Sequence, residues 1–301
     1  MNSGTAETRL IVNGKSAGRA DLRSAITDLR SRGIALDVRS TFEAGDVQRL
    51  VNEAIAEGVG RLLVGGGDGS VNEAFDALLR HDRSERPELG ILPLGSANDF
   101  ATACKIPQNL CEALLLACQG KTTAIDAIRA NDRTVANIAT AGFGAKITAE
   151  TPPELKNFLG GGAYTLMGLI KALGFKPYSG RIVSAQIEIE AKAIIGAVCN
   201  GRQAGGGQQL APKASLTDGL MDIILVLDFP ATEVNTVIKE VLDPDLSGTY
   251  VKRFQTAVLE VYSSESIPCN LDGEPYQGDN ILFSVVAKAI DVVLPPDCPC
   301  I

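Results

Sequence analysis

Gly65-Gly-Gly-Asp-Gly-Ser-Val-Asn-Glu73 lies directly after the apolar run Arg61-Leu-Leu-Val64 and directly before a helix-like stretch, 74–80. Glycines between a strand and a helix let the backbone approach a ligand, and the unpaired N–H groups of the first helical turn attract an anion. The loop is therefore typical of a phosphate-binding site. Asp68 would repel phosphate, so we expect it to serve a metal ion, a hydroxyl group or a hydrogen-bond network that holds the loop.

The sequence around this loop alternates between short apolar runs and helical patterns up to about residue 126. The runs that predict strands are 10–13, 34–39, 61–64 and 90–94, and the patterns that predict helices are 20–32, 46–57, 71–80 and 110–119. Such alternation indicates crossover connections and a parallel sheet. We therefore predict an α/β domain over residues 1–126.

Past residue 127 the pattern changes to β-rich runs, which indicate antiparallel strands. These runs are 134–140, 180–189, 194–199, 220–227, 257–262, 281–286 and 290–294. One helical insertion, 153–175, interrupts them. A chain of 301 residues with 45% hydrophobic content favours two domains over one. The second is predicted over residues 127–301, and we leave open whether its last strand or tail returns to the first domain.

Composition narrows the class of protein. The net charge of −8 gives no support for nucleic acid as a partner. Seven cysteines without paired CxxC spacing predict a cytoplasmic protein, and no signal peptide is visible. Cys104, Cys111 and Cys118 recur every seven residues, and we interpret them as core residues because no histidine lies nearby for a metal site. No apolar run approaches the roughly 18 residues that a membrane span needs.

Polar residues follow each of the four strands predicted before residue 126. The four ends are Asn13-Gly-Lys-Ser16, Ser40-Thr41, the glycine loop and Gly95-Ser-Ala-Asn-Asp-Phe100. Ligands of an open parallel sheet bind beyond the carboxyl ends of its strands, so we expect one crevice to collect all four. A Walker loop is rejected because position 9 is arginine where that motif needs glycine. A dinucleotide fingerprint is disfavoured because position 70 is serine and an acid lies within the loop.

Two of these motifs carry a resemblance to a known family. Val64–Glu73 together with Leu92-Pro-Leu-Gly-Ser-Ala-Asn-Asp-Phe-Ala101 resembles the diacylglycerol kinase catalytic domain family, which also contains sphingosine and ceramide kinases. The second half looks like the bacterial YegS-type lipid kinases in the runs Asn200-Gly-Arg-Gln-Ala-Gly-Gly-Gly-Gln-Gln-Leu-Ala-Pro212, Thr217-Asp-Gly-Leu220 and Asn270-Leu-Asp-Gly-Glu-Pro275. The resemblance covers nearly the whole chain.

The resemblance implies an N-terminal α/β nucleotide-binding domain, akin to the parallel-sheet domains of NAD kinases and phosphofructokinases, and a C-terminal antiparallel β-sandwich. It implies transfer of the γ-phosphoryl group of ATP to a lipid hydroxyl, with Mg²⁺. The positions that match the family's nucleotide contacts are Thr41, Gly67, Asp68, Gly69, Ser70, Val71, Asn72, Glu73 and Ser96. Serine stands at 70 and 96 where threonine is commoner, so the hydroxyl donor is kept. Asn13 is a weaker candidate, equally explained as a turn former.

Glu274 matches the residue regarded in this family as the proton acceptor for the lipid hydroxyl. A carboxylate can accept that proton at pH 7 if its geometry is right. The alternative makes Asp272-Gly273 a tight β-turn and Glu274 a solvated charge. The resemblance favours the catalytic interpretation for Glu274, and it leaves open whether Asp272 shares the role.

The segment 215–220 matches a Mg²⁺ site in which Ser215, Asp218 and Leu220 are the ligands, through one carboxylate and two main-chain carbonyl groups. Oxygen ligands suit a hard cation. We expect this metal to lie apart from the nucleotide phosphates and to support the second domain, with a further Mg²⁺ arriving with ATP. The alternative is that Asp218-Gly219 forms an ordinary turn.

The expected activity is an ATP-dependent lipid kinase acting on a glycerolipid of the phosphatidylglycerol or diacylglycerol type. The alternatives are an NAD kinase-like soluble kinase and a non-catalytic nucleotide-binding regulator. Arg202 is expected either to pair with a phosphate group or to form a structural salt bridge. The segment 155–175 is either an interfacial helix at the lipid entrance or part of the core. We expect a cytoplasmic protein that contacts the membrane peripherally.

Overall fold

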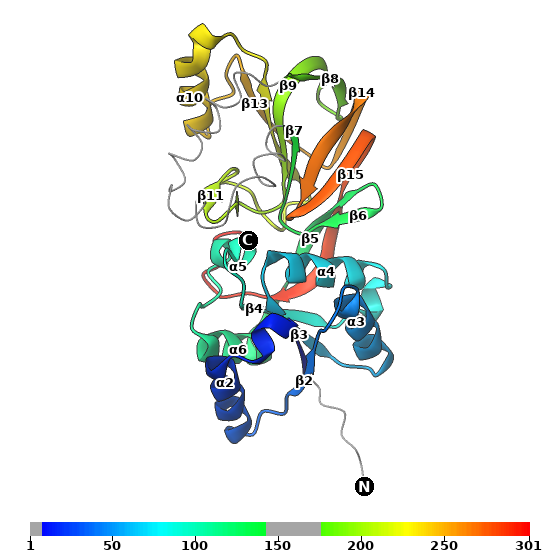
Figure 1. The fold of residues 1–301 in the computed structure, drawn as a ribbon, viewed down its shortest axis with the longest axis vertical. Helices are drawn as coiled ribbons and strands as arrows, with labels where there is room; N and C mark the ends of the chain where they lie inside the picture. The colour runs from blue at the N-terminus through cyan, green and yellow to red at the C-terminus, as the bar shows by residue number, and fades with distance from the viewer. Residues whose placement is uncertain (1–7, 143–175) are drawn as a thin grey trace. The chain divides into compact units, whose positions relative to one another are not determined.

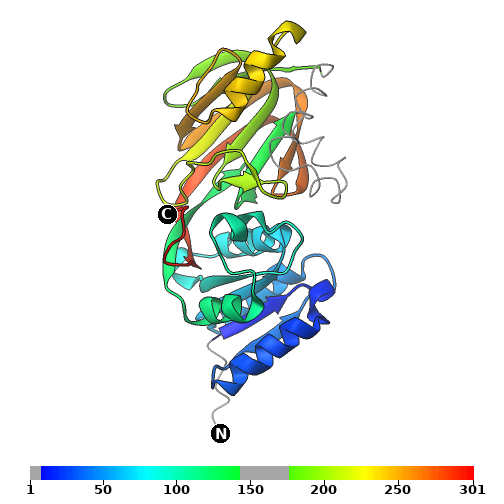
Figure 2. The ribbon, with the colours of Figure 1, turned by 90° about the vertical axis from the view of Figure 1, so that its left-hand side faces the viewer.

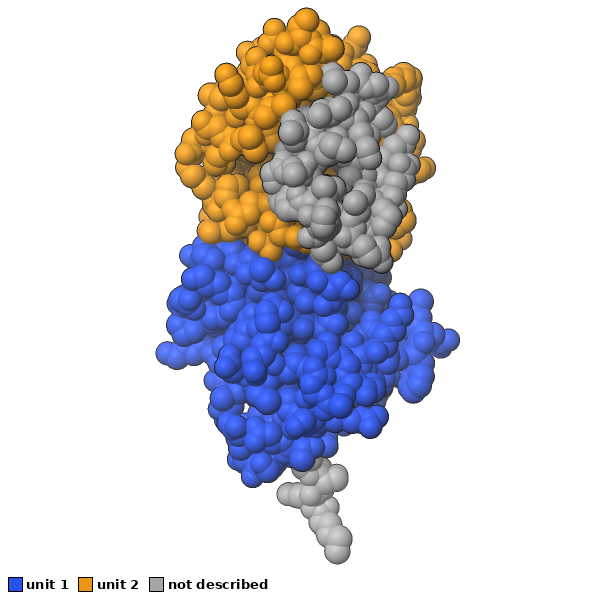
Figure 3. Space-filling model, turned by 60° about the vertical axis from the view of Figure 1, so that its left-hand side comes forward, with its two compact units in different colours: residues 1–127, 287–301 blue, residues 128–286 orange. Residues whose placement is uncertain are grey.

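The computed structural model describes residues 8–142 and 176–301 of the chain. The chain divides into two compact units, coloured separately in Figure 3. Unit 1 comprises residues 1–127 and 287–301, and unit 2 comprises residues 128–286. The helical insertion expected at 153–175 lies outside the described residues.

Unit 1 contains a parallel sheet covered by helices (Figure 1). Its strands follow the order β15-β4-β3-β1-β2, and each neighbouring pair is parallel. The strands are β1 (Thr8–Val12), β2 (Asp37–Ser40), β3 (Arg61–Gly66), β4 (Glu88–Pro93) and the end of β15 (Glu274–Val293). The helices are α1 (Gly14–Ala17), α2 (Ala20–Ser31), α3 (Asp46–Ala56), α4 (Asp68–Leu79), η1 (Arg83–Glu85), α5 (Asp99–Ala103) and α6 (Leu110–Gln119). The predicted α/β architecture is confirmed.

Burial explains why unit 1 takes this form. Leu62 and Leu63 of β3 are both fully buried, as in a parallel strand that is covered on both faces. Helix α2 buries one apolar stripe at helical spacing, made of Leu22, Ala25, Ile26 and Leu29. This stripe and the apolar face of α6 pack against β1 in one cluster, with the two helices side by side in Figures 1 and 2.

Unit 2 is built from antiparallel strands. They are the end of β5 (Thr122–Ala130), β6 (Arg133–Val135), β7 (Ile138–Gly142), β8 (Tyr178–Val183), β9 (Glu188–Cys199), β12 (Met221–Leu227), β13 (Val251–Thr256), β14 (Val258–Leu271) and the part of β15 before residue 287. A small hairpin, β10 (Gln203–Ala204) and β11 (Gln208–Gln209), and two helices, η2 (Ala231–Glu233) and α10 (Val234–Leu242), complete the described elements. The predicted antiparallel β-sandwich is confirmed.

Strands β7 and β8 lie end to end in one position of this sheet. The main order is β13-β12-β9-β7-β14-β15, and β8 also pairs with both β9 and β14, along residues 188–193 and 260–263. The strands of unit 2 pack around an apolar core. That core includes Ile182, Val198, Leu259 and Phe283.

The chain returns to unit 1 at its end. Val292 pairs with Leu89 of β4 in a parallel register. The buried Asp126 carboxylate accepts the Lys288 N–H at 2.7 Å. Residues 287–301 thus pack in unit 1. The sequence prediction placed them in the second domain, 127–301, and left open whether the last strand or tail returns to the first domain.

Candidate functional site

The first three strand ends of unit 1 are connected by hydrogen bonds. Asn13 N–H donates to the Gly65 carbonyl oxygen at 2.8 Å, which joins the end of β1 to the end of β3. The Gly14 N–H donates to Thr41 Oγ1 at 3.1 Å, which joins the end of β1 to the end of β2. Asn13 Nδ2 lies 3.5 Å from Ser70 Oγ. The polar residues predicted at these ends are therefore brought together.

A hydrogen bond and a close backbone approach hold the end of β4 against the glycine loop. The Phe100 N–H donates to Asp68 Oδ1 at 3.0 Å. Gly95 lies so close to Gly67 that a Cβ atom at 95 would stand 2.4 Å from the Gly67 Cα. Asn98 adopts a φ of 50° and brackets Gly95, accepting its N–H at 2.8 Å and donating to its carbonyl at 2.9 Å. Of the three roles expected for Asp68, the observed contact is the hydrogen-bond network.

The loop ends at the N-terminus of α4. Gly67 is the N-cap residue and supplies no side-chain cap. The N–H groups of the first helical turn therefore face outward without a capping side chain, as an anion site requires. Gly69 is exposed and Asp68 is half-buried, whereas Val71 is buried and its N–H donates to the Gly67 carbonyl. Asn72 and Glu73 follow on the same helix.

The hydroxyl groups expected to contact the nucleotide differ in their surroundings. Thr41 and Ser70 are half-buried and take part in the contacts with the end of β1. Ser96 is exposed, directly after Gly95. Each hydroxyl can donate to a phosphate oxygen without like-charge repulsion.

Asp46 shapes the loop that follows Thr41. Its carboxylate accepts the Phe42 N–H at 2.7 Å and the Glu43 N–H at 3.1 Å, and Arg49 pairs with it at 2.8 Å. The Phe42 N–H, the Arg49 guanidinium and the Glu43 N–H lower the pKa of Asp46 to about 2. This contact was missed from the sequence, where Asp46 was read only as the start of a helix.

Glu274 lies on a tight hairpin in unit 2. Leu271 of β14 pairs with Glu274 of β15, and Asp272 and Gly273 form the two-residue turn with φ angles of 51° and 101°. Both central residues having positive φ is the pattern of a type I′ hairpin. Glu274 is exposed. The tight turn proposed for Asp272-Gly273 is therefore present.

The Asp272 carboxylate anchors this hairpin to a neighbouring segment. It accepts the N–H groups of Ala136 at 2.6 Å, Asn137 at 3.2 Å and Ile138 at 2.8 Å. Three backbone donors on one carboxylate explain why an acid stands at 272, with no catalytic part required. Sequence reasoning had left this point open.

Three asparagines around the hairpin were not identified from the sequence. Asn137 Nδ2 donates to the Gln203 carbonyl at 2.9 Å, and Asn200 Nδ2 donates to the Ala136 carbonyl at 2.8 Å. Asn270 accepts the Gly273 N–H at 2.8 Å. Their amides are buried, so they fix the backbone that carries Glu274. In the sequence, the sign of such a role was an asparagine next to an apolar run that predicts a strand.

Arg202 and the segment 215–220 also lie in unit 2. Arg202 Nε donates to the Ala214 carbonyl at 2.8 Å, a partner that neither sequence interpretation had named. Asp218 Oδ1 accepts the Leu220 N–H at 3.0 Å, and Gly219 has a φ of 74°, so the segment does form a turn. The Ser215 hydroxyl accepts the Thr217 N–H at 3.3 Å.

The chemistry of this turn fits a hard cation. Asp218 is exposed, and only one of its oxygens is used by the Leu220 N–H. Burial, with the nearby Asp218 charge, raises the pKa of Asp222. A second carboxylate close to an exposed one, beside main-chain carbonyl oxygens, is an oxygen-rich and electronegative surrounding of the kind that Mg²⁺ binds.

An apolar cavity of about 70 Å³ lies within the strands of unit 2. Its walls come from β7, β8, β9, β12, β14 and β15, and include Ala139, Ile182, Leu225 and Phe283. Thr140 is also among the lining residues, and its hydroxyl oxygen is buried without a hydrogen-bond partner in the described part of the chain. The cavity can accept methylene groups.

Among the described helices, we find none with the length and apolar character needed to cross a membrane.

The chain is similar to known proteins over nearly its full length. Residues 7–130 match the diacylglycerol kinase catalytic domain, and residues 137–294 match the YegS C-terminal NAD kinase beta sandwich-like domain. A relative from Shewanella frigidimarina, called a probable lipid kinase YegS-like, is 49% identical over 97% of this chain and 95% of its own length. One from Enterobacter sp., with the same name, is 44% identical and covers 97% of each chain.

A crystal structure described as a putative diacylglycerol kinase from Bacillus anthracis has the same fold, with a TM-score of 0.80 at 24% identity over 99% of this chain and all of that one. The fold and the strand-end loops thus define a protein with a diacylglycerol kinase catalytic domain. In particular, the chain belongs to the YegS-type family of lipid kinases.

Proposed function

We propose that this protein transfers the γ-phosphoryl group of ATP to a hydroxyl group of a glycerolipid, of the phosphatidylglycerol or diacylglycerol type. The observation that carries the proposal is the group of four strand-end loops in unit 1, tied together through Asn13, Thr41 and Asp68. The names of the relatives, which match 97% of the chain, support a lipid as the acceptor.

The nucleotide phosphates would bind at the N-terminus of α4. Backbone N–H groups of residues 67–70 supply donors there, and the helix dipole favours negative charge. The hydroxyl groups of Thr41, Ser70 and Ser96 would add hydrogen bonds that carry no like charge. Asp68 would act as a positioning residue, because its carboxylate already holds the loop after β4 through Phe100 N–H.

Glu274 would accept the proton of the attacking lipid hydroxyl as the phosphoryl group is transferred. Its support is the exposed carboxylate on a hairpin whose turn is fixed by Asp272. Phosphoryl transfer mainly needs positioning, charge neutralisation and such a base. A carboxylate can act as that base if its geometry is right.

Ser215, Asp218 and Leu220 would hold Mg²⁺ through one carboxylate oxygen and two carbonyl oxygens. When bound, the ion would supply a positive charge that fixes the turn at residues 215–220. A further Mg²⁺ accompanying ATP would neutralise phosphate charge.

The lipid acceptor would be met at the membrane surface, by peripheral contact from the cytoplasm, where ATP is available and thiols stay reduced. The apolar cavity of unit 2 supports an acceptor with hydrocarbon chains. Its volume of about 70 Å³ suits only a short part of one chain, since a water molecule alone takes about 30 Å³ of liquid.

The test is a panel of acceptors with labelled ATP and Mg²⁺. Purified protein is incubated with mixed micelles containing phosphatidylglycerol, diacylglycerol, ceramide or sphingosine, and separately with NAD, and the products are identified by mass. We expect label in a phosphorylated glycerolipid. Label only in NADP would overturn the lipid proposal, and label only in a sphingoid product would overturn its glycerolipid part.

The NAD kinase-like alternative is not favoured, because the relatives that span the chain are named lipid kinases. The same panel tests it directly through the NAD arm.

A further inference from the structure

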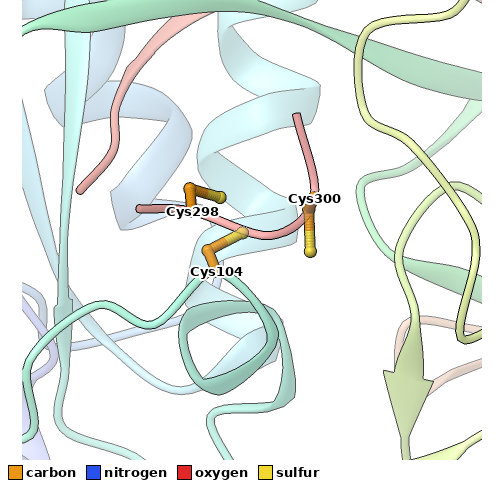
Figure 4. A group of neighbouring side chains, drawn as sticks. All are labelled: Cys104, Cys298 and Cys300. Carbon is orange, nitrogen blue, oxygen red and sulfur yellow. The ribbon is translucent and has the colours of Figure 1, made fainter. Parts of the chain in front are cut away.

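Three cysteines far apart in the sequence meet in unit 1. The Sγ atoms of Cys104, Cys298 and Cys300 all lie within 4.8 Å of one another (Figure 4). Their side chains are buried, with 1%, 6% and 1% of their surface exposed. Among the described residues, this is the group of three or more His, Cys, Asp or Glu side chains whose ligand atoms lie close enough to hold one metal ion.

The cluster differs from the grouping of cysteines that the sequence predicted. Cys104, Cys111 and Cys118 were interpreted together as core residues because they recur every seven positions. Cys111 is instead exposed and Cys118 is only half-buried. Cys104 is buried as expected, but its partners come from the C-terminal tail.

The tail is held against α5 by several contacts. The Cys298 N–H donates to the Pro295 carbonyl at 3.0 Å, which forms a turn just before the two cysteines. The Cys300 thiol donates to the Ala103 carbonyl at 3.3 Å. Lys105 pairs with Asp297 at 3.2 Å. The two tail cysteines are therefore positioned on either side of a proline, whose ring restricts the backbone between them.

The spacing of the sulfur atoms suits one cation. Zn²⁺ binds thiolate at about 2.3 Å, so three sulfur ligands around one ion stand roughly 4 Å apart. The observed upper limit of 4.8 Å means that small side-chain rotations would complete the site. Soft thiolate ligands select Zn²⁺ and Cu⁺ over Mg²⁺ or Ca²⁺.

We propose that Cys104, Cys298 and Cys300 bind one soft d¹⁰ cation, Zn²⁺ or Cu⁺, as thiolates. Three thiolates complete the coordination of Cu⁺, whereas Zn²⁺ takes a water molecule as its fourth ligand. The ion displaces the three thiol protons to solvent, and no electron is transferred. Hydrogen bonds with Cys298 and Cys300, together with burial, raise the pKa of Cys104, so the cation has to displace these protons as it binds.

Binding would clamp the C-terminal tail to the helix that follows the fourth strand-end loop. Cys104 is the C-cap residue of α5, and Phe100 of the same helix donates to Asp68. The ion is therefore expected to stabilise unit 1 as a structural site, apart from the residues that contact ATP.

The test uses the full-length protein, reduced with a phosphine and kept free of oxygen. Zn²⁺ is titrated against a colorimetric chelator, and Cu⁺ against a Cu⁺-specific chelator. We expect one equivalent of either ion to bind. Cys300→Ser should weaken binding by at least about a hundredfold, because even changes to outer-shell partners cost about 10–100-fold. Cys111→Ser, which is exposed in the same unit, and Cys269→Ser, which is buried in unit 2, should bind as the unchanged protein does.

A second measurement needs no substitution, in case Cys300→Ser fails to fold. Co²⁺ added to the unchanged protein should produce sulfur-to-cobalt charge-transfer absorption of a three-thiolate site, which Zn²⁺ abolishes. The proposal is overturned if no such absorption appears and neither Zn²⁺ nor Cu⁺ binds. It is also overturned if mass analysis of protein purified without oxygen, and alkylated before any reductant is added, shows a disulfide within the cluster. These readouts do not depend on kinase activity, so they remain informative whatever the acceptor panel shows.

Discussion

Glu274 and Asp272 are two residues apart, but their side chains have different surroundings. Asp272 receives three backbone N–H groups, whereas Glu274 is exposed at the start of β15. A carboxylate saturated with donors is a poor base, because those donors stabilise its charged form. Proton transfer is therefore proposed for Glu274 and anchoring for Asp272.

Glu274→Gln is expected to lower kcat by about 10²–10⁴-fold, the usual contribution of a general base. The amide keeps the size of the side chain but cannot accept a proton, so KM for ATP should stay unchanged. Steady-state kinetics with micellar glycerolipid measure both values, and Glu190→Gln, an exposed site on β9, is the matched control. If Glu274→Gln leaves kcat unchanged, Glu274 is not the proton acceptor.

Asp46 should make the stability of unit 1 depend on acidic pH. Its pKa is lowered from 3.8 to about 2, so the unfolded chain binds its proton more readily than the folded chain. The stabilisation is complete above pH 3.8 and is lost as the pH falls towards about 2. Urea unfolding across that range should show this loss in the unchanged protein. Asp46→Asn should lack that component, and equal pH slopes for the two proteins would contradict the assignment.

At the scale of elements, the loops after β3 and β4 depend on glycine for close approach. A Cβ atom at Gly95 would stand 2.4 Å from the Gly67 Cα, which real contacts do not reach. The two loops would have to separate, and the Asp68 contact with Phe100 would stretch with them.

Gly95→Ala is therefore expected to destabilise the protein by about 1–3 kcal/mol, the usual cost of overpacking, and to weaken ATP binding. Thermal unfolding and calorimetric titration with ATP measure the two effects. Gly18→Ala is the control, because a Cβ atom there meets nothing within 4 Å. Equal unfolding temperatures for the two variants would show that the close approach is not required.

The turn of the hairpin between β14 and β15 is a second element that depends on one side chain, the Asp272 carboxylate. Asp272→Asn keeps a residue that tolerates the φ of 51° but turns one acceptor into a donor facing N–H groups. We expect a loss of roughly 1–3 kcal/mol, the cost of leaving buried donors unsatisfied. Chemical denaturation measures it, and Asp279→Asn on the exposed part of β15 is the control. A loss no larger than that of the control would contradict the anchoring role.

At the scale of the whole molecule, the sites proposed for ATP phosphate and for Mg²⁺ lie in different units. The loops proposed to bind phosphate are in unit 1, and the turn proposed to bind Mg²⁺ is in unit 2. Each ligand stabilises the folded state that binds it, so the two effects can be measured one at a time.

Mg²⁺ without ATP is expected to stabilise the protein by about 2.7 kcal/mol when its free concentration is about 100 times Kd. Asp218→Ala should abolish this gain, because the carboxylate ligand is removed. Thermal unfolding with and without Mg²⁺ measures it, and Asp132→Ala, exposed in the same unit, should keep it. A full gain in Asp218→Ala would place the ion elsewhere.

Much of the fold was predictable because it depends on local patterns. Apolar runs such as 62–64 and helical stripes such as that of α2 are both buried when helices cover the faces of a parallel sheet. The meeting of the glycine loop with its serine and threonine neighbours was predictable for the same reason, since parallel strands carry their ends to one edge. The hydrogen bonds made by Asn13, Thr41 and Asp68 show how the strand ends are joined.

The rest depends on contacts between residues distant in the sequence, which leave no local pattern. The insertion of β7 and β8 between β9 and β14 and the return of residues 287–301 are such contacts. So are the anchoring of Asp272 by 136–138 and the meeting of Cys104 with Cys298 and Cys300. The sequence by itself determined the two kinds of domain and the glycine loop between a strand and a helix, because strand and helix periods and glycine conformations are local properties. Only the tertiary structure decided which acid is anchored and which cysteines meet, because burial and hydrogen bonding across the chain set those partners.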